Sequence, residues 1–95
     1  MIPEFNTDKY DRCYCAIATP YKPDSLEVDY NAFRKLVRYF TTDKEFLKSK
    51  GAIIANPEAG EIFCLTPEER NELIKIVLEE QPAEMPVFSG CYGVR

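Results

Sequence analysis

The residues with the clearest chemical potential follow a short apolar run in the middle of the chain. The run Ala52-Ile53-Ile54-Ala55 is typical of a buried parallel strand, and it leads into the loop Asn56-Pro57-Glu58-Ala59-Gly60-Glu61. This loop holds two carboxylates, a proline that fixes one backbone angle and a glycine that frees another. Ligands of parallel α/β proteins bind at the carboxyl ends of the strands. The loop is therefore a candidate binding site, and an ordinary strand-to-helix turn is the alternative.

A helix is predicted directly after this loop, over residues 67–80. Thr66 stands at the cap position, Pro67 occupies the first helical position, and Glu69 completes an S/T-x-x-E capping box. The helix is expected to end before Pro82, because proline disfavours helical geometry in the residue before it. Its apolar residues recur at helical spacing: Leu73, Ile74, Val77 and Leu78.

The rest of the chain continues this alternation of strands and helices. The predicted elements are strands near 13–19, 52–55 and 86–89 and helices near 30–40 and 67–80. A short helical extension over 41–50 is expected to end at Gly51. Because each crossover is helical, the strands should be parallel and the connections right-handed. The predicted fold class is α/β, in one domain over residues 1–95, with Thr19, the loop 56–61 and Ser89 on one rim.

Composition narrows the range of partners. The 95 residues include 12 basic and 16 acidic side chains, which gives a formal net charge of -4. Without a basic excess, nucleic acid and anionic membrane surfaces are not expected as partners. No apolar run approaches the roughly 20 residues of a membrane span, and the polar first residues do not look like a signal peptide. The expectation is a soluble protein of the cytoplasm.

Cysteine and histidine usage argues against metal chemistry. The four cysteines are Cys13, Cys15, Cys64 and Cys91, and the chain has no histidine. Structural zinc sites favour C-x-x-C pairs or histidine ligands, whereas this chain has only C-x-C. Cys13 and Cys15 are expected to share one face of a strand as small packed residues. We therefore expect no metal and no cofactor, and the usual histidine general base is also absent.

Several short motifs occur together in a fixed order along the chain. They are A-I-A-T-P at 16–20, V-D-Y at 28–30, K-L-V at 35–37, G-A-I-I at 51–54, G-E at 60–61, L-T-P-E-E-R at 65–70 and P-V-F-S-G at 86–90. In this order they resemble the N-terminal portion of the dihydrodipicolinate synthase and N-acetylneuraminate lyase family, which comprises pyruvate-type Schiff-base class I aldolases. The resemblance covers nearly the whole chain.

The resemblance implies a fold and a reaction. It implies that the chain forms about the first three β/α steps of a TIM (β/α)8 barrel. Family members make or break a carbon–carbon bond through a lysine Schiff base to pyruvate or another 2-oxo acid. The lysine and a proton-relaying tyrosine belong to later strands, so no catalytic residue is assigned within 1–95, and these residues alone are expected to be inactive. A small 2-oxo acid or sugar-acid substrate and a homo-oligomer, commonly a tetramer, are also implied.

The candidate loop departs from the family pattern. That pattern reads G-T-T-G-E or G-S-T-G-E, and its two hydroxyl residues bind the substrate carboxylate. Glu58 and Ala59 occupy these two positions here, whereas Gly60 and Glu61 keep the pattern. Three roles are open to Glu58: a general acid or base, a partner for substrate hydroxyls or an amine, or a solvent-exposed side chain. Substrate-binding candidates are thus Glu58, Ala59, Gly60, Glu61 and Thr19, with core packing as the alternative for Thr19.

Three functions are compatible with this sequence. The first is a Schiff-base lyase of this family with an altered substrate. The second is a non-catalytic relative that binds a sugar acid or amine or serves in assembly. The third is a small, independent α/β binding module.

Overall fold

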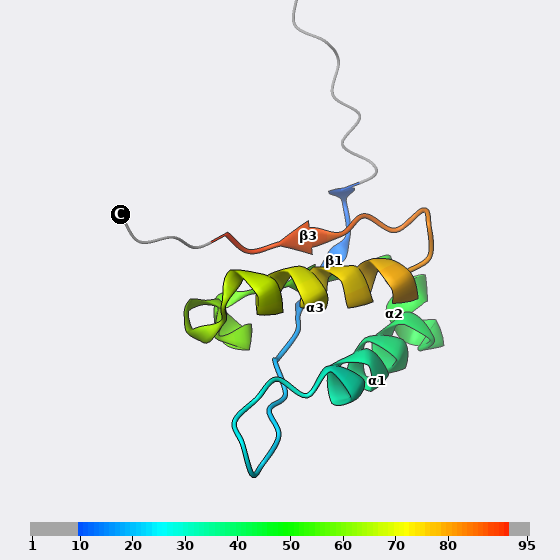
Figure 1. Ribbon diagram of the computed structural model, residues 1–95. Coiled ribbons are helices and arrows are strands. Elements are labelled where there is room, and N and C mark those ends of the chain that lie inside the picture. The colour runs from blue at the N-terminus through cyan, green and yellow to red at the C-terminus, as the bar shows by residue number, and fades with distance from the viewer. Residues whose placement is uncertain (1–9, 92–95) are drawn as a thin grey trace, which may run out of the picture.

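The computed structural model describes residues 10–91 of the chain. Three short strands form one sheet: β1 (Cys13–Ala16), β2 (Gly51–Ala55) and β3 (Phe88–Ser89). Three α-helices accompany it, namely α1 (Tyr30–Thr41), α2 (Lys44–Lys48) and α3 (Pro67–Glu80), and two single 3-10 turns, η2 (Glu58–Gly60) and η3 (Ile62–Cys64), precede α3. Figure 1 labels β1, β3, α1, α2 and α3 and colours the chain from the N-terminus to the C-terminus.

The sheet has the order β1-β2-β3, and both strand pairs are parallel. Ile54 of β2 is the partner of Ala16 in β1 and of Phe88 in β3, so these three residues lie on one face of the sheet. The predicted α/β class is confirmed, and three parallel strands with flanking helices are consistent with the start of a TIM barrel.

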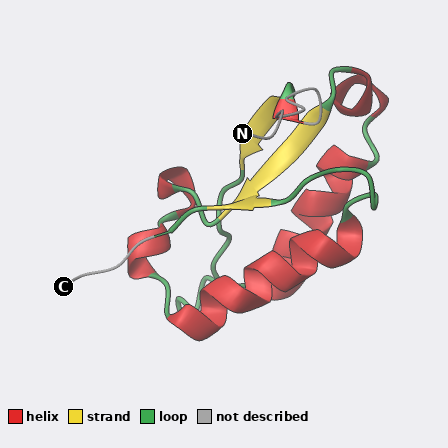
Figure 2. Ribbon diagram, turned by 90° about the horizontal axis from the view of Figure 1, so that it is seen from above, coloured by secondary structure: helices red, strands yellow, loops and turns green. Residues whose placement is uncertain are grey.

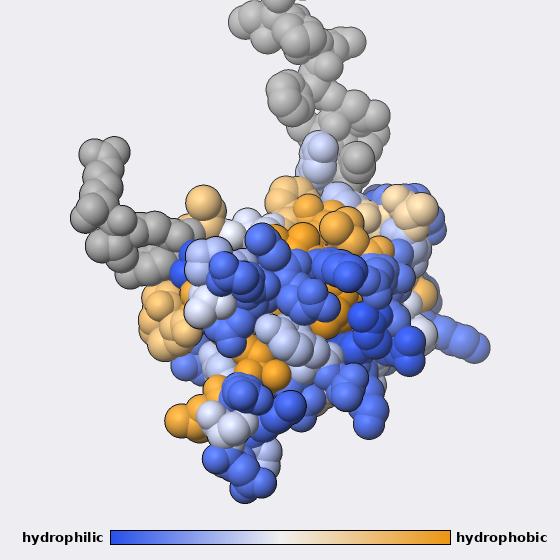
Figure 3. All heavy atoms as spheres, viewed as in Figure 1, coloured by the Kyte–Doolittle hydropathy of each residue, from blue (hydrophilic) through white to orange (hydrophobic). Residues whose placement is uncertain are grey.

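The long helices α1 and α3 lie on the same side of the sheet, as two perpendicular views show (Figures 1 and 2). The apolar core lies between the helices and β2, and Ile53, Phe33, Val37, Leu73 and Val77 are at most 1% exposed. Seen from the side of α3, the helices present mostly hydrophilic residues, and apolar residues gather near the strands (Figure 3). The described chain therefore has one core, on one side of its sheet.

Local signals position the helices. The Asp29 side chain accepts a hydrogen bond from the Ala32 amide at 3.0 Å at the start of α1. The predicted capping box of α3 is present, because the Thr66 amide donates to the Glu69 carboxylate at 2.8 Å and the Glu69 amide donates to the Thr66 hydroxyl at 3.1 Å. Ion pairs then join the two helices, with 2.9 Å between Arg34 and Glu79.

The outer strands are shorter than the sequence indicated. β1 ends at Ala16 rather than near Thr19, because the ladder lengthens to 3.5 Å between the Ile17 amide and the Ile54 carbonyl oxygen and then stops. β3 begins at Phe88 rather than near residue 86. The Gln81 side chain takes the place of a strand beside β2, since its carbonyl oxygen accepts from the Ile53 amide at 3.2 Å.

The connection before β2 also differs from the expectation. Residues 41–50 contain the separate short helix α2, and Gly51 is the first residue of β2 rather than a helix cap. Lys50 has the left-handed backbone angle, with φ of 56°. A glycine is required at position 51 by space rather than as a helix cap, because a Cβ atom there would lie 2.5 Å from the ring of Phe46.

Within residues 10–91, no helix is long and apolar enough to cross a membrane.

Candidate active site

The carboxyl ends of the three strands meet at one rim of the sheet. The residues after β1 contact the loop after β2 through Thr19 and Gly60. The same loop contacts the end of β3 through Asn56 and Ser89, and the Gly90 amide donates to the Ala55 carbonyl oxygen at 2.8 Å. The rim expected from parallel strands is therefore formed by segments that hydrogen-bond to one another.

Thr19 holds the loop through its side chain. Its hydroxyl donates to the Gly60 carbonyl oxygen at 2.6 Å, and the residue is only 8% exposed. A Cβ atom at Gly60 would lie 2.9 Å from the Ile17 carbonyl oxygen and 3.0 Å from the Thr19 hydroxyl oxygen. Gly60 is thus required by the close approach of two chain segments, since its backbone angle φ is not positive.

The two residues that the motif resemblance placed at hydroxyl positions lie on an exposed turn. Glu58 and Ala59 form the first two residues of η2, and both side chains are exposed. The turn is closed by the Gly60 amide, which donates to the Pro57 carbonyl oxygen at 3.0 Å. Glu61 is also exposed and has a left-handed backbone, with φ of 60°. The Glu58 and Ala59 side chains are therefore presented to solvent between two anchored ends.

Asn56 is the residue of this rim whose role the sequence did not reveal. It is 2% exposed and has a left-handed φ of 51°. Its amide nitrogen donates to the Arg70 carbonyl oxygen at 3.1 Å and to the Ser89 hydroxyl at 3.3 Å. The amide oxygen is buried and has no hydrogen-bond partner among the described residues. An asparagine directly after a buried strand was the available signal, because asparagine tolerates the left-handed region.

A cavity of about 220 Å³ lies beside Asn56, between the start of α3 and the end of β3. Arg70 lines it, and its guanidinium donates to the Ile62 carbonyl oxygen at 2.9 Å. Ser89 and Gly90 line the opposite side, and a Cβ atom at Gly90 would collide with the Asn56 carbonyl oxygen. None of the five residues predicted to bind substrate lines this cavity.

Tyr21 lies close to the same rim. Burial raises the pKa of its phenol above the ordinary value, and the nearby Glu61 carboxylate and Cys64 thiol raise it further. The hydroxyl is buried and makes no hydrogen bond within residues 10–91. Tyr21 is therefore an uncharged phenol at neutral pH.

The cysteines and acidic residues do not form a metal centre in the described part of the chain. No group of three or more cysteine, aspartate or glutamate side chains converges between residues 10 and 91. All four cysteine thiols are free. Burial, followed by the neighbouring Cys13, raises the pKa of the Cys15 thiol above its ordinary value.

Comparison with curated proteins gives consistent matches. The chain is 33% identical over 75 residues to a 4-hydroxy-tetrahydrodipicolinate synthase of Methylococcus capsulatus and 38% identical over 78 residues to that of Chlorobaculum parvum. A synthase of the same name from Cytophaga hutchinsonii is 32% identical over 80 residues. The alignments include 79%, 80% and 82% of this chain, respectively, and 24% of each synthase.

The chain is related to the N-terminal part of the dihydrodipicolinate synthase family. It spans about a quarter of the length of these synthases. No family model and no solved structure matches the chain. The relationship to the synthases agrees with the resemblance in the sequence motifs, and enzymes with TIM barrels carry their active sites at the carboxyl ends of the strands. The rim of Thr19, residues 56–61 and Ser89 is thus the candidate active site.

Proposed function

We propose that this chain is the N-terminal part of a Schiff-base lyase that makes or breaks a carbon–carbon bond next to a 2-oxo acid. One observation supports this proposal above the others: the hydrogen bond between Thr19 and Gly60 joins the ends of β1 and β2 and fixes the turn that carries Glu58. In a relative of the synthases, that turn stands where the substrate is expected. The lysine that forms the Schiff base is expected on a later strand, outside residues 1–95.

We propose further that the substrate differs from plain pyruvate. An ionised Glu58 would repel a substrate carboxylate by roughly 1–4 kcal/mol at about 4 Å, depending on the local dielectric. Ala59 offers no hydrogen bond. The exposed carboxylate of Glu58 instead suits a substrate that presents a hydroxyl or an amine, such as a sugar acid. Gly60 and Glu61 keep the shape of the turn, and Thr19 anchors it.

The net charge and the free cysteine thiols support the substrate class and the compartment that we propose for this protein. The net charge of -4 supports a small-molecule substrate rather than nucleic acid or a membrane surface. Four free thiols suit a reducing compartment, and we assign the enzyme to the cytoplasm. It is proposed to act as a homo-oligomer, a tetramer by resemblance, without a metal or an organic cofactor.

The test is reductive trapping of the protein expressed from its full reading frame. The protein is incubated with a panel of 2-oxo acids, including pyruvate, and with borohydride, and the products are analysed by intact and peptide mass spectrometry. The expected result is a stable adduct on one lysine beyond Arg95. An absence of any adduct from a folded protein would contradict lyase chemistry, and retained ligand binding in that case would assign a non-catalytic binding role.

A pair of matched variants tests the role assigned to Glu58. Glu58→Gln removes the charge, so the KM for pyruvate is expected to fall about tenfold, which corresponds to about 1.4 kcal/mol. Glu45→Gln makes the same chemical change on the exposed helix α2 and should leave the KM unchanged. Equal KM values for the two variants would show that Glu58 faces solvent and takes no part in binding.

A further inference from the structure

One arginine of α3 contacts both ends of the turn that carries Glu58. The Arg70 guanidinium donates to the Ile62 carbonyl oxygen, at 3.2 Å from Nε and at 2.9 Å from Nη2. The Arg70 carbonyl oxygen accepts a hydrogen bond from the Asn56 side-chain amide at 3.1 Å. Asn56 directly precedes the turn of residues 57–61, and Ile62 directly follows it. Arg70 therefore holds both ends of the turn from a single position on a helix.

The position of Arg70 in α3 is itself fixed. The capping box of Thr66 and Glu69 fixes the start of the helix, and the Arg70 amide donates to the Thr66 carbonyl oxygen at 3.0 Å. The Arg70 side chain is half-buried. A planar guanidinium is pre-organised, so it loses little conformational freedom for each hydrogen bond that it forms. The contact to the turn is thus made by a well-ordered group.

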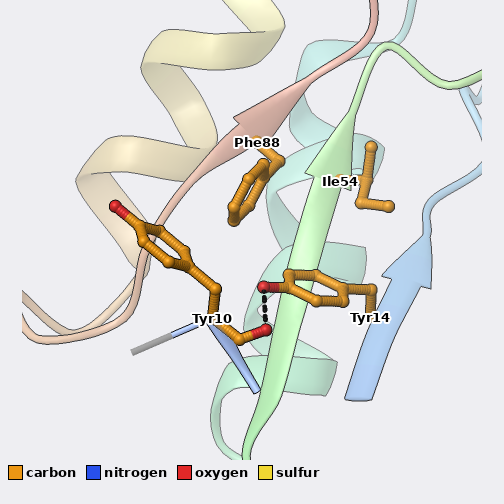
Figure 4. Close-up of a pocket in the computed structure, with 4 residues that line it drawn as sticks. All are labelled: Tyr10, Tyr14, Ile54 and Phe88. Atoms are coloured by element: carbon orange, nitrogen blue, oxygen red, sulfur yellow. Dashed lines mark hydrogen bonds between the residues drawn. The ribbon is translucent and has the colours of Figure 1, made fainter. Parts of the chain in front are cut away.

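The Asn56 end of the turn is also tied to β3. Phe88 is the register partner of Ile54, and both side chains lie on the face of the sheet away from the apolar core (Figure 4). Successive side chains of a strand point to opposite faces, so Ser89 points toward the side of the helices. There its hydroxyl accepts from the Asn56 side-chain amide at 3.3 Å. Asn56 thereby joins the start of the turn to both α3 and β3.

The hydrogen bonds within the turn are local. The Gly60 amide donates to the Pro57 carbonyl oxygen at 3.0 Å, and the Glu61 amide donates to the Glu58 carbonyl oxygen at 2.8 Å. The Ile62 amide lies 3.4 Å from the Pro57 carbonyl oxygen. The backbone of this turn sets where the exposed Glu58 side chain points, and the contacts at its two ends set the position of that backbone.

We infer that Arg70 and Asn56 are positioning residues that set the direction in which Glu58 is presented to the substrate. The inference rests on the proposed function, in which Glu58 contacts a hydroxyl or an amine of the substrate. Arg70 and Asn56 act through the turn and not on the substrate itself. Loss of either contact therefore weakens substrate binding more than it slows the reaction of bound substrate.

The first test measures the turn without substrate, in the protein expressed from its full reading frame. Hydrogen–deuterium exchange is followed by mass spectrometry for a peptide of residues 57–62, with a peptide of residues 72–80 as the internal reference. Arg70→Met is expected to speed exchange of the first peptide at least about fivefold and to leave the reference unchanged, because local opening of the turn becomes easier. An unchanged exchange rate for residues 57–62 would overturn the inference.

Two further variants make this test specific. Arg34→Met is the matched control, because the Arg34 guanidinium forms ion pairs with Glu79 and Glu80 at 2.9 and 3.5 Å and does not contact the turn. It should leave the exchange of residues 57–62 at the wild-type rate. Ser89→Ala is a milder change that removes one acceptor of the Asn56 amide, and it should speed this exchange about twofold. If Arg70→Met does not fold, an unchanged rate in Ser89→Ala overturns the inference.

A kinetic measurement separates positioning from a general loss of folded protein. A smaller folded fraction lowers the apparent kcat at constant KM, whereas a misdirected Glu58 raises the KM. For Arg70→Met we expect the KM for a hydroxylated 2-oxo acid to rise about fivefold, with kcat within about twofold of the wild type. A lower kcat at unchanged KM would overturn the inference. If no Schiff-base adduct forms, the proposed reaction is wrong, and the exchange experiment still decides whether Arg70 holds the turn.

Discussion

Asn56 joins three segments of the chain at the rim of this protein. Its side chain ties the end of β2 to the Arg70 carbonyl oxygen and to Ser89 of β3, and its backbone takes the left-handed turn that starts the loop. A buried amide can hold two segments in this way because it donates hydrogen bonds without carrying charge.

Asn56→Asp should therefore destabilise the protein. The substitution removes the donor to Arg70 and places a carboxylate at a position that is 2% exposed, so a loss of about 1–3 kcal/mol is expected. Urea unfolding followed by circular dichroism measures this change. Asn71→Asp makes the same change on the exposed part of α3 and should stay within about 0.5 kcal/mol. Equal unfolding midpoints for the two variants would contradict the role given to Asn56.

Gly60 is constrained by space rather than by backbone angle. Gly60→Ala would force a methyl group to within 2.9 Å of the Ile17 carbonyl oxygen, so a loss of about 1–3 kcal/mol is expected from overpacking. The same urea titration measures it, with Ala59→Ser at the neighbouring exposed position as the control. If Gly60→Ala unfolds at the wild-type midpoint, the contact between the β1 and β2 ends is looser than described.

At the scale of elements, some features could be predicted from the sequence and others could not. The limits of α3 follow from local chemistry, because the capping box of Thr66 and Glu69 and the proline at the first position act within one helical turn. The lengths of β1 and β3 depend on which distant residues pair with β2. Sequence periodicity contains no information about those contacts. Both strands were therefore predicted to be longer than they are in the structure.

Gln81 illustrates a contact that sequence reasoning missed. Its side chain accepts from the Ile53 amide at 3.2 Å and donates to the Pro86 carbonyl oxygen at 3.1 Å, which links the end of α3 to the sheet. A glutamine before a proline looks like an ordinary end of a helix. Only the folded chain shows that it completes the ladder of β2 where β3 has not yet begun.

Gln81→Leu tests the contribution of the hydrogen bond between the Gln81 side chain and the Ile53 amide. The substitution keeps an apolar stem but leaves the buried Ile53 amide without an acceptor, so a loss of about 1–3 kcal/mol is expected. Hydrogen exchange measured by NMR should show faster exchange of the Ile53 amide, with little change at Ala55 in the same strand. Unchanged protection of the Ile53 amide would show that another group accepts its hydrogen bond.

At the scale of the whole molecule, the described chain depends on one core. Leu73 is fully buried in it, together with Phe33 of α1 and Ile53 of β2. The apolar periodicity of α3 predicted Leu73 and Val77 in this core, but Leu78, which it also included, is 60% exposed, and Ile76, which it left out, is 1% exposed. The candidate site was predicted only in outline, because the position of Thr19 on the rim follows from parallel strands, whereas the anchoring role of Asn56 requires contacts across 14 and 33 residues of sequence.

Leu73→Ala tests the dependence on one core. Removing this side chain should cost about 2–5 kcal/mol, which is a large part of the stability of a small domain. The thermal midpoint measured by far-ultraviolet circular dichroism should fall, and the helical signal should still be lost in a single transition, since α1 and α3 share the core. Leu78→Ala, at a position that is 60% exposed, serves as the control. A midpoint equal to that of the control would show that the core does not depend on Leu73.

The anchored turn at Glu58 and Ala59 has a consequence for how this protein can diversify. Its two ends are held by Thr19 and Asn56, whereas the two side chains between them face solvent. Codons 58 and 59 can therefore change with little effect on folding while they alter what the rim contacts. A mutational library restricted to these two codons is expected to sample new ligand preferences among variants that remain folded.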